Sequence, residues 1–175
     1  ILYYRTRMYS GNNMNLKDYI IDVPNWPKDG ITFKDITPLL ADTNALEFAT
    51  LSMRGLVDVN KSVSHIVGIE ARGFIFGSHL AKRMNCSFIP LRKKGKLPPP
   101  VISKEYELEY GTDCLEIKKG DGKVVIVDDV YATGGTAKAA RELVFEAGYD
   151  IVEEIFLINL KFLNQDKVKS VITYE

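Results

Sequence analysis

Short apolar runs alternate with helical patterns along most of this chain, and this alternation constrains the fold more than any other feature. The runs have the length of strands that are buried on both faces, and they cover residues 65–69, 86–91, 123–127 and 151–158. Helical patterns over residues 73–84 and 136–147 lie between them. Because parallel strands need long, usually helical, connections, the sequence predicts an α/β fold with a central, mostly parallel sheet flanked by helices.

The remaining segments are less regular. Residues 15–23 predict a short helix and residues 24–40 look loop-like. A helix is expected from Asp42 to about residue 58, because the Asp-Thr-Asn cluster at residues 42–44 is a helix-start signal. Residues 92–120 combine three consecutive prolines, a basic run and scattered glycines. We expect a long loop there, and a long loop inside a compact domain is usually functional.

Composition excludes several classes of protein. Lys plus Arg (23) equals Asp plus Glu (23), so no global field favours nucleic acid or an acidic membrane as a partner. No apolar run approaches the ~18 residues that span a bilayer. His65 and His79 have no clustered partners, which argues against zinc chemistry and a histidine-activated nucleophile. Cys86 and Cys114 lie far apart, a usage that fits the reducing cytoplasm.

The 175 residues have the size of one domain with a hydrophobic core. The first thirteen residues, ILYYRTRMYSGNN, lack the apolar core of a signal peptide. A more ordinary stretch begins at Met14. We therefore interpret residues 1–13 as an upstream extension or a tag, and residues 14–175 as a single domain.

The run VVIVDDVYATGGT, residues 124–136, carries an apolar strand into two aspartates and then into small residues. Ligands of open parallel sheets bind beyond the carboxyl ends of the strands. The first N–H groups of the following helix have no partner within the helix and carry partial positive charge. Glycines let a phosphate approach them closely, and threonines add hydroxyl donors. The candidate phosphate cradle consists of Ala132, Thr133, Gly134, Gly135 and Thr136.

Asp128 and Asp129 cannot hold the phosphate themselves, because like charges repel. Ionised carboxylates only accept hydrogen bonds, so hydroxyl groups one sugar away from the phosphate are natural partners. A ribose 5-phosphate fits both halves of the run. Two alternatives remain open on this chemistry: a strand-to-helix turn with solvated acids, or a metal site like that of phospho-acceptor signalling domains. The run lacks the lysine of a GxxxxGK[ST] loop, which argues against an ATPase.

The same thirteen residues resemble the phosphoribosyl-pyrophosphate (PRPP) motif of the type I phosphoribosyltransferases. Four further segments resemble the adenine phosphoribosyltransferase family: FKDITPLL, GIEARGFIFG, RKKGKLP and YELEYGTDCLEI. The likeness extends from about residue 15 to residue 175. It implies the type I phosphoribosyltransferase fold, with a small N-terminal hood over about residues 15–40 and a mobile catalytic lid over about residues 97–112.

The resemblance also assigns roles around the PRPP motif. Asp128 and Asp129 would position the ribose and stabilise positive charge on it, while the cradle binds the phosphate. The segment Glu70-Ala-Arg-Gly73 would form a second strand-to-helix turn beside the first, with a cis peptide at Glu70–Ala71. Arg72 would lie near the pyrophosphate and the base, and the unfavourable place of its charge at a helix start favours such a role over that of a plain surface arginine. Lys93 and Lys96 are our choices for neutralising pyrophosphate.

Other positions would handle the base. Within the lid, Glu109 is the candidate general base for the adenine proton, and Tyr110 belongs to the same motif. In the hood, Phe33 would stack on adenine and the backbone near Thr32 would read its amino edge, whereas we expect Trp26 to pack in the core. Two further base-site candidates are Lys34 and Leu160. Many family members have arginine in place of Lys34, and lysine lacks the planar fork of arginine.

The resemblance implies one reaction: adenine and PRPP give AMP and pyrophosphate, with inversion at C1 of the ribose. Magnesium would arrive with PRPP and be held mainly by substrate and water. A homodimer is carried over from the family. Two rivals remain: a phosphoribosyltransferase for another base, and a PRPP-binding regulator without catalysis. The sequence has no attached DNA-binding domain and no basic recognition helix, which speaks against the regulator.

Overall fold

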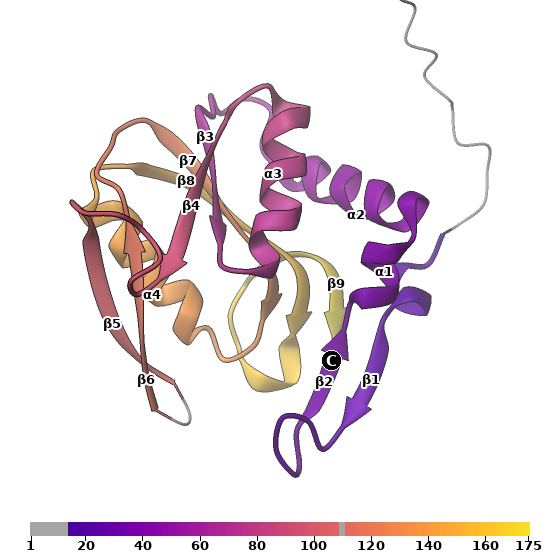
Figure 1. Ribbon diagram of the computed structural model, residues 1–175. Helices are drawn as coiled ribbons and strands as arrows, with labels where there is room; N and C mark the ends of the chain where they lie inside the picture. Colours follow the sequence, from indigo (N-terminus) through magenta and orange to yellow (C-terminus); the bar gives the residue numbers. More distant parts are fainter. Residues whose placement is uncertain (1–13, 109–110) are drawn as a thin grey trace, which may run out of the picture. The chain divides into compact units, whose positions relative to one another are not determined.

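The computed structural model describes residues 14–108 and 111–175 (Figure 1). The candidate residues Glu109 and Tyr110, and the extension over residues 1–13, lie outside the described residues. The chain divides into two compact units, Ile1–Phe48 and Ala49–Glu175. Each unit is described by itself below.

The described part of the first unit begins with a short 3-10 helix, η1 (Leu16–Tyr19), and an antiparallel pair of strands. The strands are β1 (Ile21–Pro24) and β2 (Thr32–Asp35), followed by α1 (Thr37–Ala41). The short helix expected over 15–23 is present only as η1, since β1 takes up the end of that range. The loop expected over 24–40 is wrong where β2 and α1 lie. Four-residue strands are too short to show an alternating pattern. Trp26 is half exposed, at 50%, so our expectation that it packs in the core is also wrong.

Helix α2 (Thr43–Leu56) begins where the sequence predicts. Asp42 explains the position, because its carboxylate accepts hydrogen bonds from the backbone N–H groups of Asn44 (2.9 Å) and Ala45 (2.8 Å). These contacts satisfy N–H groups that have no partner within the helix.

The second unit is built on a seven-stranded sheet with the order β5-β6-β4-β3-β7-β8-β9 (Figure 1). Five strands are parallel to their neighbours, and β5 and β6 form an antiparallel hairpin that continues the sheet. The predicted α/β fold with a mostly parallel sheet is confirmed. The strands are β3 (His65–Ile69), β4 (Ser87–Lys93), β5 (Ile102–Leu108), β6 (Gly111–Ile117), β7 (Lys123–Tyr131), β8 (Asp150–Leu160) and β9 (Lys169–Tyr174).

Two helices cover the sheet. Helix α3 (Arg72–Met84) connects β3 to β4, and α4 (Gly135–Glu146) connects β7 to β8. The two crossovers run in opposite directions along the strand order, so right-handed connections place the helices on opposite faces. The face under α4 forms a core of buried apolar side chains that includes Val67, Ile69 and Ile126. This covering explains why the central strands β3 and β7 are apolar over most of their length.

The long loop expected over residues 92–120 is largely wrong, because most of it is the hairpin β5–β6. In β5, Ile102 and Tyr106 pack against the core, whereas Ser103, Glu105 and Glu107 are exposed. An edge strand with one polar face has no continuous apolar run to reveal it. The other edge strand, β9, was missed for the same reason.

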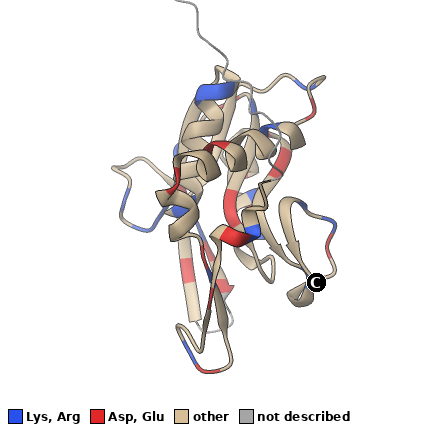
Figure 2. Cartoon of the chain, turned by 90° about the vertical axis from the view of Figure 1, so that its right-hand side faces the viewer, with Lys and Arg blue, Asp and Glu red and all other residues tan. Residues whose placement is uncertain are grey.

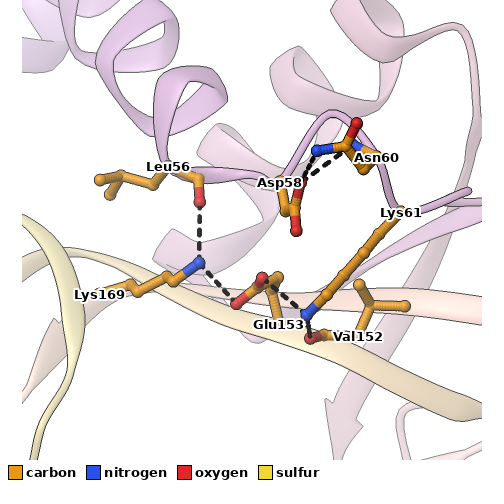
Figure 3. A network of polar contacts seen from close by, with 7 residues as sticks. All are labelled: Leu56, Asp58, Asn60, Lys61, Val152, Glu153 and Lys169. Carbon is orange, nitrogen blue, oxygen red and sulfur yellow. Dashed lines mark hydrogen bonds and ion pairs between the residues drawn. The ribbon is translucent and has the colours of Figure 1, made fainter.

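The loop after α2 is fastened to the sheet by a polar network on β8 and β9 (Figure 3). Glu153 lies between two ammonium groups, with Lys61 Nζ at 3.1 Å and Lys169 Nζ at 2.9 Å from its carboxylate oxygens. Lys169 also donates to the carbonyl of Leu56 (3.2 Å), and Lys61 to that of Val152 (3.3 Å). One carboxylate thus ties three segments together.

Charge is distributed evenly along the chain. Figure 2 shows Lys and Arg alternating with Asp and Glu along the ribbon rather than separating into a basic and an acidic half. Within the ranges that the structure describes, no helix is both long enough and apolar enough to cross a membrane.

Candidate active site

Two strand-to-helix turns lie at the carboxyl edge of the sheet. Strands β3 and β7 pair in parallel, with His65 opposite Val124 and Gly68 opposite Val127. Their carboxyl ends therefore meet, and so do the turns that follow them, as the sequence predicts. Strand β7 continues through both aspartates to Tyr131. The two acids therefore lie within the end of the strand and not in the loop after it.

An ion pair joins the two turns. Arg72 Nε lies 2.8 Å from Asp129 Oδ2. Asp129 is 3% exposed, and among the described residues its Oδ2 atom accepts no well-aligned hydrogen bond. Two residues chosen separately from the sequence thus come into contact. Oδ2 thus has a charged partner but no well-aligned hydrogen bond, and a ligand or water can complete such a group.

A glycine allows the turns to pack so closely. A Cβ atom at Gly73 would lie 2.7 Å from the carbonyl oxygen of Val127 and 2.9 Å from Asp128 Oδ1. These distances are below ordinary van der Waals contact, so a side chain would separate α3 from β7. On the other side, Asp128 Oδ1 accepts a hydrogen bond from the backbone N–H of Asp129 (2.8 Å).

The surroundings of the two aspartates resist ionisation. Burial raises the pKa of Asp128 well above its ordinary value, and the negative charge of Asp129 raises it further. Burial also raises the pKa of Asp129, although the nearby Arg72 guanidinium opposes this effect. A ligand that donates hydrogen bonds to these carboxylates would favour their charged forms. Perturbed carboxyl pKa values of this kind are typical of functional sites.

The phosphate cradle, Ala132–Thr136, leads into α4 without a side-chain cap. The N-cap residue, Gly134, has a φ of +87°, in the left-handed region that glycine tolerates. Because no side chain caps the helix, its first backbone N–H groups are available to an anion. Helix α4 starts at Gly135, one residue before the predicted start.

Residues far along the chain support the cradle. Tyr131 donates its hydroxyl hydrogen to Asp166 Oδ2 (2.5 Å), and this hydroxyl would lie 2.5 Å from a Cβ atom at Gly134. The buried Asn164 donates to the carbonyls of Ala132 (2.8 Å) and Leu160 (2.9 Å). These hydrogen bonds attach the cradle loop to residues 160–166. Sequence reasoning missed them, because nothing in the local pattern marks partners more than thirty residues away.

Four cations lie in the segment Arg92–Lys96, which covers the last two residues of β4 and the turn after it and is called the basic turn below. Glu70 attaches this basic turn to the second strand-to-helix turn. Its carboxylate accepts hydrogen bonds from Arg92 Nε and Nη2 (both 3.1 Å) and from the backbone N–H of Lys93 (2.9 Å). The Arg92 hydrogen bonds are the main reason why the pKa of Glu70 is lowered. The Glu70–Ala71 peptide is cis, as the resemblance implies. Glu70 is a positioning residue that the sequence analysis did not select.

The two lysines chosen for pyrophosphate differ in their surroundings. Lys93 Nζ pairs with the carboxylate of Asp113 and contacts the hydroxyl of Tyr106 (3.2 Å). Lys96 is exposed, and its backbone N–H donates to the carbonyl of Lys93 (3.2 Å) in a turn. Arg92 Nη1 closes the same turn by donating to the carbonyl of Lys96 (3.1 Å). The turn therefore presents several cations on a constrained backbone.

The candidate base-site residues lie on both units. Leu160 ends β8 and is 8% exposed. Within the first unit, Thr32, Phe33 and Lys34 follow one another on β2. Lys34 Nζ pairs with Asp22 Oδ1 at 2.6 Å, so this lysine neutralises a carboxylate of the neighbouring strand.

Phe33 contacts the exposed Trp26. Their rings meet edge to face, with centroids 4.4 Å apart. Phe33 itself is partly buried. Trp26 thus forms part of the β1–β2 hairpin surface beside the ring proposed to stack on the base.

Comparison with known proteins agrees with this arrangement. Residues 32–171 match the model of the phosphoribosyl transferase domain. An adenine phosphoribosyltransferase of Bdellovibrio bacteriovorus is 47% identical over 166 residues, which cover 92% of this chain and 100% of the relative.

Solved structures agree as well. Adenine phosphoribosyltransferase from Thermoanaerobacter pseudethanolicus is 43% identical, with a TM-score of 0.84 over 91% of this chain and 98% of that chain. The enzyme from Saccharomyces cerevisiae, complexed with adenine and an imino-altritol bisphosphate, is 34% identical, with a TM-score of 0.81 over 89% of this chain and 94% of that chain. Paired turns, buried aspartates and relatives of this similarity lead to one conclusion: the chain belongs to the adenine phosphoribosyltransferase family.

Proposed function

We propose that this protein transfers the 5-phosphoribosyl group of PRPP to adenine, which gives AMP and pyrophosphate in purine salvage. The observation that carries the proposal is the contact between the two turns, where Arg72 and the buried Asp129 pair beside an uncapped helix start. The relatives are named for this activity, and the yeast structure holds adenine. The substrate has an anion at each end and hydroxyls between them, and the site offers the matching groups in the same order.

The ribose and its 5-phosphate would occupy the turn after β7. The phosphate would accept hydrogen bonds from the backbone N–H groups of Ala132–Thr136 and from the threonine hydroxyls. Asp128 and Asp129 would accept hydrogen bonds from the ribose hydroxyls. As pyrophosphate leaves, positive charge develops on the sugar, and carboxylates nearby stabilise it.

The pyrophosphate would occupy the space between the second turn and the basic turn. The base nitrogen attacks C1 of the ribose, the C1–oxygen bond to pyrophosphate breaks, and the leaving oxygen takes the electron pair. Arg72, Lys93 and Lys96 would neutralise this leaving charge. Glu70 contributes indirectly, since its hydrogen bonds with Arg92 keep the basic turn beside Arg72.

Magnesium is the proposed cofactor, bound together with PRPP. In the part of the chain that the structure describes, no group of three potential ligands could hold a metal ion. We propose that the ion keeps substrate oxygens and waters as its ligands, as Mg²⁺ prefers, with Asp128 and Asp129 as the neighbouring carboxylates. Such an ion would supply charge neutralisation to the pyrophosphate oxygens.

The finer assignments are further parts of the proposal. Thr32, Phe33, Lys34 and Leu160 would form the base site, with Glu109 as general base and Tyr110 beside it. We also propose a cytoplasmic homodimer. Two free cysteines, one of them buried, suit a reducing compartment, and sedimentation would measure the oligomeric state.

One assay tests the proposal. PRPP and magnesium are incubated with adenine, hypoxanthine, guanine, xanthine or orotate in parallel, and nucleotide formation is measured. AMP from adenine alone is the expected result. Turnover with a different base would move the protein to another specificity. PRPP binding by calorimetry without turnover of any base would favour a regulator.

A further inference from the structure

Lys93 is the cation of the basic turn whose side chain pairs with the β5–β6 hairpin in a partly buried position. Its ammonium pairs with the carboxylate of Asp113 and contacts the Tyr106 hydroxyl at 3.2 Å. The Tyr106 hydroxyl in turn contacts Asp113 Oδ2 at 3.2 Å. The three side chains come from β4, β5 and β6 respectively, so this triad, Lys93–Asp113–Tyr106, joins the hairpin to the strand that carries the basic turn.

Sheet register builds the triad. Tyr106 lies directly opposite Asp113 in the β5–β6 pair, and Lys93 lies opposite Leu115. Asp113 is two residues from Leu115 and so points to the same face of the sheet. The three polar groups therefore share one face by construction, and they are only partly exposed, at 37% for the Lys93 side chain and 27% for that of Asp113.

The neighbouring cation provides a contrast. Lys94 also has a carboxylate on the hairpin, Glu105, but the two lie 3.4 Å apart with side chains 70% and 73% exposed. An exposed pair of this kind contributes little. The basic turn thus makes two ion pairs with the β5–β6 hairpin, a partly buried one from Lys93 and an exposed one from Lys94.

We propose that Asp113 is a resident counter-ion that competes with pyrophosphate for Lys93, and thereby weakens the binding of PRPP and of the released pyrophosphate. This inference rests on the proposed function, in which Lys93 neutralises the leaving group. An ammonium that must leave a carboxylate to reach a phosphate gives up part of its interaction energy. The carboxylate also repels the incoming anion.

The sign of the effect follows from this competition. Asp113→Asn removes the competing charge but keeps the size of the side chain and a hydrogen-bond acceptor. Tyr106 remains in place to position the ammonium. The variant should therefore bind anions more tightly and release pyrophosphate more slowly, a gain that mere loss of a structural contact would not produce.

Calorimetric titration with magnesium pyrophosphate tests the proposal. Asp113→Asn should bind about five-fold more tightly, since a partly exposed ion pair is worth ~1 kcal/mol. Glu105→Gln is the matched control and should bind like the wild type. Affinity of Asp113→Asn that is unchanged or weaker would overturn the proposal.

The same substitution in a Lys93→Met variant tests whether Asp113 weakens pyrophosphate binding by pairing with Lys93. In Lys93→Met, the change Asp113→Asn should tighten binding by clearly less than five-fold, because only the direct repulsion of the anion is then removed. If the full five-fold gain persisted there, Asp113 would act by direct repulsion alone and the role of counter-ion to Lys93 would be refuted. Failure of the proposed function can be told apart from failure of this proposal. Wild-type protein that makes no AMP contradicts the proposed function, whatever the ratio of these affinities.

Discussion

At the scale of single residues, the site contains two acids whose ionisation the folded protein disfavours. Asp129 is buried and Asp128 is partly buried, and both have raised pKa values. An acid with a raised folded-state pKa takes up protons more readily when folded than when unfolded. Its contribution to stability therefore declines as pH rises from its ordinary pKa through the raised one. The proposed function gives a reason for this cost at neutral pH, since the carboxylates would then serve a ligand.

Asp128→Asn should separate these roles. We expect the variant to lose most of its kcat/KM for PRPP, since a neutral amide cannot replace a negatively charged hydrogen-bond acceptor. We also expect it to melt at a higher temperature than the wild type. The gap in melting temperature should grow as pH rises from about 4, the ordinary pKa of an aspartate, through the raised pKa of Asp128, because only the wild type then has to ionise this acid. Melting curves across this range measure it.

The control for this variant is Asp121→Asn, a change at an exposed aspartate shortly before β7. It should alter neither activity nor the pH dependence of melting. Wild-type kcat/KM in Asp128→Asn would remove Asp128 from the site.

Gly73→Ala should be costly. Its methyl group would meet the carbonyl of Val127 and the carboxylate of Asp128 at less than 3 Å, and overpacking of this kind typically costs about 1–3 kcal/mol. Urea unfolding should show the loss, and kcat/KM for PRPP should fall because Asp128 is displaced.

Gly55→Ala provides the comparison, because it is also helical and no atom lies within 4 Å of the added Cβ. It should stabilise by about 0.5–1 kcal/mol, the usual difference between alanine and glycine in a helix. Equal effects at the two glycines would contradict the close-packing argument.

At the scale of elements, much of the sheet was predictable. The buried strands and the helices between them appear within a few residues of their expected positions, because apolar runs and helical periodicity are local signals. The hairpin β5–β6 and strand β9 were not, since edge strands have one polar face. The hairpin β1–β2 was too short to recognise.

The loop that forms the phosphate cradle shows the limit of local patterns. The run of residues was predicted from the sequence, but the contacts that Tyr131 and Asn164 make around it were not. Burial and the bond to Asp166 raise the pKa of Tyr131 to about 12, so its O–H remains a donor at any physiological pH. The Tyr131–Asp166 bond therefore supports the cradle constantly.

Tyr131→Phe should loosen this element. It removes one hydrogen bond to a carboxylate, which contributes about 1.5–3 kcal/mol, and it leaves Gly134 without its packing partner. We expect a lower free energy of unfolding and a several-fold higher KM for PRPP, with kcat changed less. Asp166→Asn keeps an acceptor oxygen and should be milder. A normal KM in Tyr131→Phe would show that the cradle needs no support from behind.

At the scale of the whole molecule, sequence reasoning found the residues proposed to touch substrate better than those that position them. Arg72, Asp128 and Asp129 stand in a recognisable run and proved to be neighbours. Glu70, Asn164 and Asp166 act through partners that only the folded chain brings near. Local patterns record what a segment offers to a ligand, whereas positioning depends on tertiary contacts that no segment contains.

The residues of the site and the whole molecule's binding of PRPP are connected by the protons exchanged on binding. The free site holds acids with raised pKa values, and the bound site requires carboxylates that accept hydrogen bonds from ribose. PRPP binding should therefore release protons, and the release should diminish as pH rises above the raised pKa values. Calorimetry in two buffers of different ionisation enthalpy gives the number released at each pH.

PRPP and its magnesium complex also titrate, so the wild type must be compared with Asp128→Asn. The ligand's own contribution is common to both proteins, and the difference between them reports the aspartates. We expect the variant to release fewer protons below neutral pH, with the two curves converging at higher pH. Identical release across the range would mean that Asp128 is already ionised in the free protein, and the stability gain expected for Asp128→Asn would then lose its basis as well.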